Sequence, residues 1–197
     1  MAEIAAQTVY FDKGGPANTD RTLELVAERA RDLGITTVVV ATTSGATGLA
    51  AAQLLSGLNV VAVTHSAGFR KPFEVGYDVG TGEQIRAAGG HVLTTTHAFG
   101  GVGRAVRKKL DTYQVDEIIA FTLRTFGQGM KVVAEITLMA ADAGLIPDAG
   151  PIIAVGGSGR GADTAVVIQP THAQTFFDLR FLEVICMPAP GHPGLAT

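Results

Sequence analysis

The chain has one cysteine, no tryptophan and few charged residues. Cys186 has no partner for an internal disulfide and no CxxC pair is present, which favours a reducing, cytoplasmic compartment. Charged residues make up 17% of the 197 residues, the formal net charge is −3, and no basic run is longer than residues 107–109. We therefore expect no nucleic-acid partner, because such a partner requires a clustered positive surface.

Long hydrophobic runs are also missing. No stretch approaches the ~18 uninterrupted apolar residues of a membrane span, and residues 1–8 lack the basic start of a secretion signal, so we expect no membrane partner. Hydrophobic residues still make up 47% of the chain, enough for the core of one domain over residues 1–197, with a frayed tail from about residue 188. The scarcity of charge also indicates surface buried between subunits, and we expect a homo-oligomer.

Apolar and β-branched runs alternate with helical patterns along the chain. Buried strands are predicted at 36–41, 59–64, 91–95, 152–155 and 164–169, with further strands at 8–11 and 181–187. Helices are predicted at about 18–33, 46–55, 82–88, 102–110, 115–124 and 130–143. The alternation predicts an α/β fold with a mostly parallel sheet covered on both faces. One end should be antiparallel, because the connection from 155 to 164 is too short for a parallel crossover.

A polar loop lies between the strand at 36–41 and the helix that follows it. Its candidate ligand-binding residues are Thr42, Thr43, Ser44, Gly45 and Thr47. Helix N-termini offer N–H groups and a positive dipole end to an anion, and open α/β sheets bind ligands at the carboxyl ends of their strands. We interpret the loop as a neutral phosphate cradle, not a Walker A loop, since no lysine follows the glycine. Simple helix capping is the alternative.

A glycine-rich loop follows the strand at 152–155. It contains the candidate residues Gly157, Ser158, Gly159, Arg160 and Asp163. A dinucleotide fingerprint is excluded because β-branched residues, not a helix, follow the loop. We interpret it as a nest of backbone amides with Arg160 as a charged clamp, and with Asp163 orienting that arginine or binding a ligand hydroxyl. The alternative is a tight hairpin with a solvated arginine.

Two histidines are candidates for acid–base chemistry. His65 and His97 each follow a threonine at the end of a predicted parallel strand, and Gly68 lies in the loop after His65. They could donate hydrogen bonds or move protons at the ligand-binding edge, or merely tie loops together. A metal shared with His172 or Asp163 is the remaining alternative, but no metal-binding spacing supports it, so we expect no metal site.

The long helix at 130–143 and the segment before it carry a narrow polar stripe. Arg124, Gln128 and Lys131 are candidates to face the ligand, and the alternative is a core helix with a Lys131–Glu135 pair. The rest of the helix is mostly apolar, which predicts contact with a second subunit. Cover within the chain, by residues 102–124 or 176–187, is the other possibility.

Seven motifs in the same order resemble small stand-alone proteins of bacteria and archaea related to the carboxyl-terminal domain of pyruvate kinase. They are ANTDRTLELVAERARDLGI, VVVATTSGATG, VVAVTHSAGF, VLTTTHAFGG, TLRTFGQGMKV, EITLMAADAGLIP and AVGGSGRGADTAVVIQPTHAQTFFDL, within residues 8–187. The resemblance implies a three-layer α/β/α sandwich. It also implies that residues 42–47 match the loop that holds an effector phosphate in pyruvate kinases, and that flavin mononucleotide (FMN) is a tentative cofactor. The catalytic barrel of pyruvate kinase is absent, so the kinase reaction is not implied. The motifs around His65, His97 and residues 157–163 have no counterpart to carry over.

The leading hypothesis is a protein that binds a small phosphorylated ligand, FMN or a similar nucleotide. Any enzyme activity would then be that of a flavin-dependent oxidoreductase. One alternative is a regulatory module that senses a phosphorylated metabolite without turnover. The other is a small hydrolase or lyase with His65 or His97 as general base.

Overall fold

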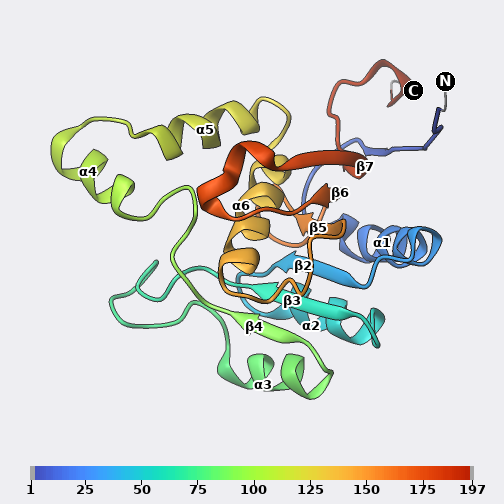
Figure 1. The fold of residues 1–197 in the computed structure, drawn as a ribbon, viewed down its shortest axis with the longest axis horizontal. Helices are drawn as coiled ribbons and strands as arrows, with labels where there is room; N and C mark the ends of the chain where they lie inside the picture. Colours follow the sequence, from blue (N-terminus) through green and yellow to red (C-terminus); the bar gives the residue numbers. More distant parts are fainter. Residues whose placement is uncertain (1–2, 196–197) are drawn as a thin grey trace.

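The computed structural model describes residues 3–195, and its centre is a seven-stranded sheet (Figure 1). The strands are β1 (Val9–Phe11), β2 (Thr37–Ala41), β3 (Asn59–Val63), β4 (His91–Leu93), β5 (Ile152–Gly156), β6 (Thr164–Gln169) and β7 (Arg180–Pro188). Their order is β1-β7-β6-β5-β2-β3-β4, and only β6 runs antiparallel to its neighbours. The predicted antiparallel pairing of 152–155 with 164–169 is confirmed.

Helices cover both faces of this sheet. One face carries α1 (Thr19–Leu33), α2 (Ala46–Leu54) and α3 (Val79–Ala87), and the other carries α5 (Val115–Arg124) and α6 (Gln128–Asp142). The helix α4 (Val102–Leu110) precedes α5, and short 3₁₀ turns lie at Pro16–Asn18, Ala173–Asp178 and Pro193–Leu195. Each face has its own apolar cluster, because central strand residues such as Val38 and Val39 point to opposite sides and are fully buried. The predicted mostly parallel α/β/α sandwich is confirmed.

The helix α6 is an internal helix of the chain. Ala134 and Ala140 are fully buried and Ala141 is 7% exposed, and the apolar cluster around α6 includes residues of α5 and of the 3₁₀ turn Ala173–Asp178. The expectation that α6 faces a second subunit is therefore wrong. The stated alternative, cover by residues 102–124 and 176–187, accounts for its apolar circumference.

The described part of the tail runs beside the first strand. Ala189 donates a backbone hydrogen bond of 2.9 Å to Phe11, and the ring of His192 stacks on Tyr10. The last two residues of the predicted frayed tail, 196–197, lie outside the described residues. Within residues 3–195, no helix has both the length and the apolar character to cross a bilayer.

Candidate functional site

The carboxyl ends of β2, β3, β4 and β5 meet at one edge of the sheet, as parallel strands require. The helix α6 runs the opposite way, so its first turns reach the same edge. A cavity of about 590 Å³ opens there, lined among others by Ser44, Thr47, His65 and Arg160. A smaller cavity of about 190 Å³ adjoins it, and both are lined by Thr43, His65 and Gln128. This edge is where the sequence predicted ligand binding.

The loop 42–47 combines a structural threonine with exposed polar groups. Thr42 is buried, and its hydroxyl accepts hydrogen bonds from the N–H groups of Gly45 (3.1 Å) and Gly48 (3.3 Å). The capping alternative thus holds for Thr42, whose hydroxyl shapes the loop; Thr42 does not line the larger cavity, although it is among the residues around the smaller one. Gly45 has φ +99°, and a Cβ at this position would lie 2.6 Å from Thr81 Cγ2, so glycine is required here.

The groups left at the start of α2 face the larger cavity. Thr43, Ser44, Ala46 and Thr47 all line it. Among residues 3–195, no acceptor contacts the N–H groups of Ser44, Ala46 or Thr47. Hydroxyls and unpaired N–H groups at a helix N-terminus together suit an anionic ligand.

The charged side chains that line the larger cavity are positive. Arg70 and Arg160 line it, together with Gly157, Gly159 and Gly161, and no aspartate or glutamate is among its lining residues. The whole chain has a net charge of −3, so this positive cavity is a local feature. An arginine beside exposed backbone amides is the arrangement expected for phosphate or carboxylate.

Asp163 does not act on a ligand or on Arg160. It is fully buried, and one of its carboxylate oxygens accepts hydrogen bonds from the N–H groups of Gly15 (2.8 Å) and Ser158 (3.0 Å). Thr164 donates to the other oxygen at 2.8 Å. The predicted roles for Asp163 are therefore wrong, and the carboxylate instead fixes the glycine loop against the start of the chain. Ser158 lines a third cavity, of about 410 Å³, which shares Gln128 and Gly159 with the larger one.

The two candidate histidines lie in contact, which the sequence did not show. His65 Nδ1 is 3.2 Å from His97 Nε2, and His65 Nε2 is 3.5 Å from Thr43 Oγ1. The ring of Phe69 stacks on His65 with a centroid distance of 4.2 Å and lies 5.2 Å from the ring of His97. The guanidinium of Arg104 lies over the Phe69 ring, 5.3 Å from its centroid. These contacts hold both imidazoles in fixed orientations; His65 lines both cavities and His97 lines the smaller one.

Behind the histidines lies a buried ion pair on α6. Lys131 and Glu135 are 5% and 4% exposed and contact each other, and His97 Nδ1 lies 3.4 Å from the same carboxylate. The second carboxylate oxygen of Glu135 accepts a hydrogen bond of 3.2 Å from the backbone N–H of Phe99. The Lys131–Glu135 pair given as the alternative interpretation is present, and Lys131 also lines the smaller cavity.

Burial and neighbouring charges shift the pKa values of this cluster. Burial alone would raise the pKa of Glu135, but the hydrogen bond from His97 and the charge of Lys131 outweigh it and lower the pKa to about 2. Burial lowers the pKa of Lys131, and Glu135 offsets only part of that effect. Burial also lowers the pKa of His65, with His97 and Arg70 adding to the effect. A neutral His65 and an ionised Glu135 follow at neutral pH.

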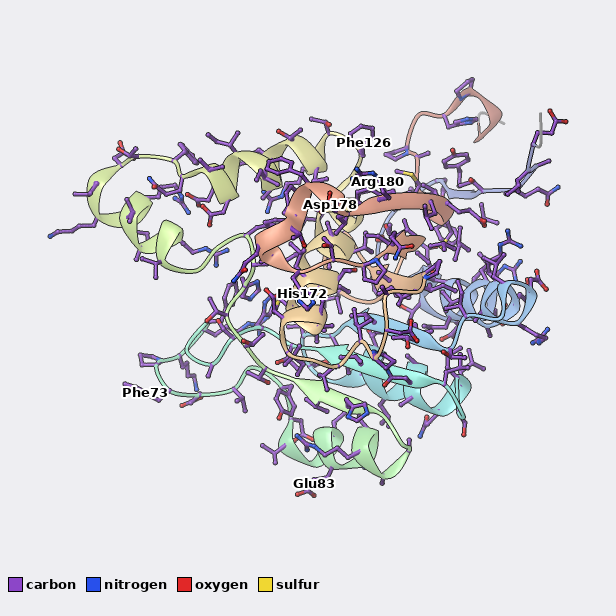
Figure 2. The ribbon with its side chains drawn as sticks, viewed as in Figure 1. Phe73, Glu83, Phe126, His172, Asp178 and Arg180 are labelled. Carbon is purple, nitrogen blue, oxygen red and sulfur yellow. The ribbon has the colours of Figure 1, made fainter. Side chains whose placement is uncertain are left out.

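Of the other predicted residues, two line a cavity and two do not. Arg124 and Gln128 line the smaller cavity, where Arg124 Nε donates to Gln128 Oε1 at 2.7 Å. Gly68 is not among the lining residues of either cavity, and its N–H donates to the carbonyl of Glu74 within its own loop. His172, labelled in Figure 2, has Nδ1 3.1 Å from Asp142, the last residue of α6. The cavities lie at the first turns of α6, so His172 cannot join His65 around a metal.

Sequence reasoning did not assign a site role to Glu135, Phe69 or Arg70. The spacing of Lys131 and Glu135 along α6 did predict their pairing. No sequence signal predicted that His97 would lie on top of that pair, because the loop after β4 brings it there. Cys186 is buried in β7, and burial raises the pKa of its thiol to about 11, so it is inert at neutral pH.

Comparison with known proteins gives one family match. The family model described as the pyruvate kinase α/β domain matches residues 20–168. A pyruvate kinase from Cryptosporidium parvum is 16% identical, over 80% of this chain and 23% of that chain, with a TM-score of 0.43. The structure of O-ureido-L-serine synthase is 24% identical, over 48% of this chain and 30% of that chain, with a TM-score of 0.30. This chain therefore spans less than a third of either solved protein.

Proposed function

The chain belongs to the family of the pyruvate kinase α/β domain, and on that premise we propose that it binds a small phosphorylated ligand in the larger cavity. The observation that carries the proposal is the charge of that cavity. Within residues 3–195, two arginines, several hydroxyls and three N–H groups without an acceptor line it, and no carboxylate does. A phosphate group would meet hydrogen-bond donors on both sides, from the start of α2 and from Arg160.

FMN or a similar nucleotide is the ligand we propose. The cavity volume of about 590 Å³ is within the usual range for small-molecule sites. The flavin itself rests on the family resemblance, and a flavin-dependent oxidoreductase would follow only if it binds. Native mass spectrometry of the purified protein, with the visible spectrum of oxidised flavin as a second readout, tests this identity directly.

The phosphate cradle is tested by Ser44→Asp. Ser44 is exposed at the start of α2, so aspartate there is compatible with folding but places a negative charge where the phosphate would bind. We expect calorimetry to show that Ser44→Asp abolishes FMN binding. The matched control is Ser56→Asp, an exposed serine beyond the other end of α2, which should bind as the parent does. Unchanged affinity in Ser44→Asp would overturn the cradle.

Two other functions remain proposals. A regulatory module would bind a sugar phosphate at the same place without turnover, and it would be colourless and gain thermal stability from that ligand. A hydrolase or lyase is favoured by one observation, the contact of His65 with Thr43 and His97 at the cavity edge. Phosphate release that is lost in His65→Gln would support this second candidate.

A further inference from the structure

Positive charges outnumber negative ones around the two histidines. Among the residues that the structure describes, Glu135 is the only one with a carboxylate lining the smaller cavity, and Lys131 already contacts it. Arg104 and Arg124 also line this cavity, and Arg70 lines the adjoining one. A proton added to His97 would place another positive charge beside a carboxylate that is already balanced. The surplus of positive charge around this histidine pair favours the neutral form of its imidazoles.

Neutral imidazoles leave one arrangement of ring protons. His97 Nδ1 faces a carboxylate oxygen, which only accepts, so this nitrogen carries the proton. His97 Nε2 then has a lone pair, and the nitrogen 3.2 Å away, His65 Nδ1, must donate to it. His65 consequently has no proton on Nε2, so this atom accepts from Thr43 Oγ1, 3.5 Å away, and a ligand hydroxyl would replace that long contact.

We propose that Glu135, acting through His97, holds His65 in the Nδ1–H tautomer, so that His65 Nε2 accepts a hydrogen bond from a hydroxyl group of the bound phosphate ester. His65 lines the same cavity as Ser44 and Thr47, so one ligand can reach both. The ligand class is a phosphate ester with hydroxyls on neighbouring carbons, as in a sugar phosphate or a ribityl phosphate. This part of the inference rests on the proposed phosphate site.

The three residues have different roles in this arrangement. His65 touches the ligand, while His97 and Glu135 are positioning residues that act through it. Phe69 covers the faces of both rings, so the edge of His65 that bears Nε2 is its accessible polar edge. The same lone pair is what a general base acting on that hydroxyl would need.

Nuclear magnetic resonance tests the tautomers without any ligand. In the ¹⁵N-labelled full chain at neutral pH, long-range ¹H–¹⁵N correlations should show Nδ1 protonated and Nε2 unprotonated in His65 and His97. His97→Phe keeps a ring against Phe69 but removes the acceptor, so His65 should shift toward the Nε2–H tautomer. The control His172→Phe alters an exposed histidine at the far end of α6 and should leave His65 unchanged. A protonated Nε2 in the parent, or an unchanged His65 in His97→Phe, overturns the proposal.

The role of Glu135 needs a variant that stays folded. The double variant Lys131→Met/Glu135→Leu removes both charges, a change that buried pairs usually tolerate. His97 should then lose its preference for the Nδ1–H tautomer, and His65 should lose it as well. Retention of both Nδ1–H tautomers in the double variant would mean that Glu135 does not position them.

Calorimetry with two probes separates this inference from the phosphate site itself. We expect His97→Phe to lower the affinity for ribose 5-phosphate about tenfold, which corresponds to the loss of one hydrogen bond. The affinity for inorganic phosphate should be unchanged. Equal weakening of both probes, or of neither, overturns the hydroxyl contact. If the parent binds neither probe, the proposed phosphate site fails and the ligand contact fails with it, while the tautomers are judged by the resonance experiment alone.

Discussion

Glu135→Gln should lower the free energy of unfolding strongly at neutral pH and less in acid. The substitution keeps the size and shape of a side chain that is 4% exposed, but it removes the negative charge that Lys131 and His97 contact. Lys131 is then a buried ammonium without its counterion. Breaking a buried ion pair from one side usually costs about 3–5 kcal/mol.

The pKa of Glu135 gives an independent magnitude. The folded protein lowers it from 4.5 to about 2, and at 1.36 kcal/mol per unit the ionised carboxylate contributes about 3 kcal/mol at pH 7. Because the folded pKa is the lower one, this contribution is complete above the unfolded value and disappears as the pH falls from 4.5 to about 2. The glutamine variant never has it, so the stability difference from the parent should shrink to about 1.4 kcal/mol at pH 3.

Urea unfolding followed by circular dichroism measures this difference, provided that the slope of free energy against urea is unchanged. The control Glu28→Gln changes an exposed glutamate on α1 and should stay within about 0.5 kcal/mol of the parent. Lys131→Met/Glu135→Leu should recover most of the loss, since no unpaired charge remains. A loss below about 1 kcal/mol at pH 7, or one that does not change with pH, would refute the reasoning.

Four further predictions concern the ligand, the packing of α6 and self-association. In calorimetry, Arg160→Ala should weaken the binding of FMN by about 1.5–3 kcal/mol and the binding of riboflavin by less, because only FMN has the phosphate. Gly129→Ala should lower the free energy of unfolding by about 1–3 kcal/mol, since its Cβ would lie 2.0 Å from Thr164 Oγ1, whereas Gly76→Ala, with no atom within 4 Å, should be neutral. Sedimentation should show association at micromolar concentration, and a clean monomer would reject the expected homo-oligomer. Ala141→Arg should unfold the chain instead of blocking association, because Ala141 is 7% exposed inside one subunit.

Most of the fold could be predicted because its signals are local. The ranges 102–110 and 115–124 coincide with α4 and α5, and the short connection between β5 and β6 gave their antiparallel pairing. The surroundings of α6 could not be predicted in the same way. A wide apolar arc shows that a helix is covered, but it does not show by what. The residues of α5 and of Ala173–Asp178 that cover α6 are distant in sequence from most of it. The pattern alone therefore fits cover by the same chain as well as cover by a second subunit.

The site shows the same limit at the level of single residues. The sequence identified polar residues at the ends of parallel strands, since the topology brings those ends to one edge. It could not distinguish a residue that faces a ligand from one that holds its loop. Thr42 and Asp163 belong to the second kind, because backbone N–H groups occupy their oxygens. Neighbouring Thr43 and Arg160 line the cavity. Only the direction of each side chain separates the two kinds.

Close packing of α6 on the sheet connects the core to this site. Gly129 lies against Thr164, and a Cβ on Gly156 would be 3.0 Å from the carbonyl of Gly129. The first turn of α6 therefore reaches the end of β5 and the start of β6 only because positions 129 and 156 lack side chains. From that position the next two turns carry Lys131 and Glu135 beneath His97. A side chain at Gly129 would push this pair away from the histidines. The glycines that pack α6 are thereby also part of what orients His65, and Gly129→Ala should disturb the His65 tautomer in the same resonance experiment that tests His97→Phe.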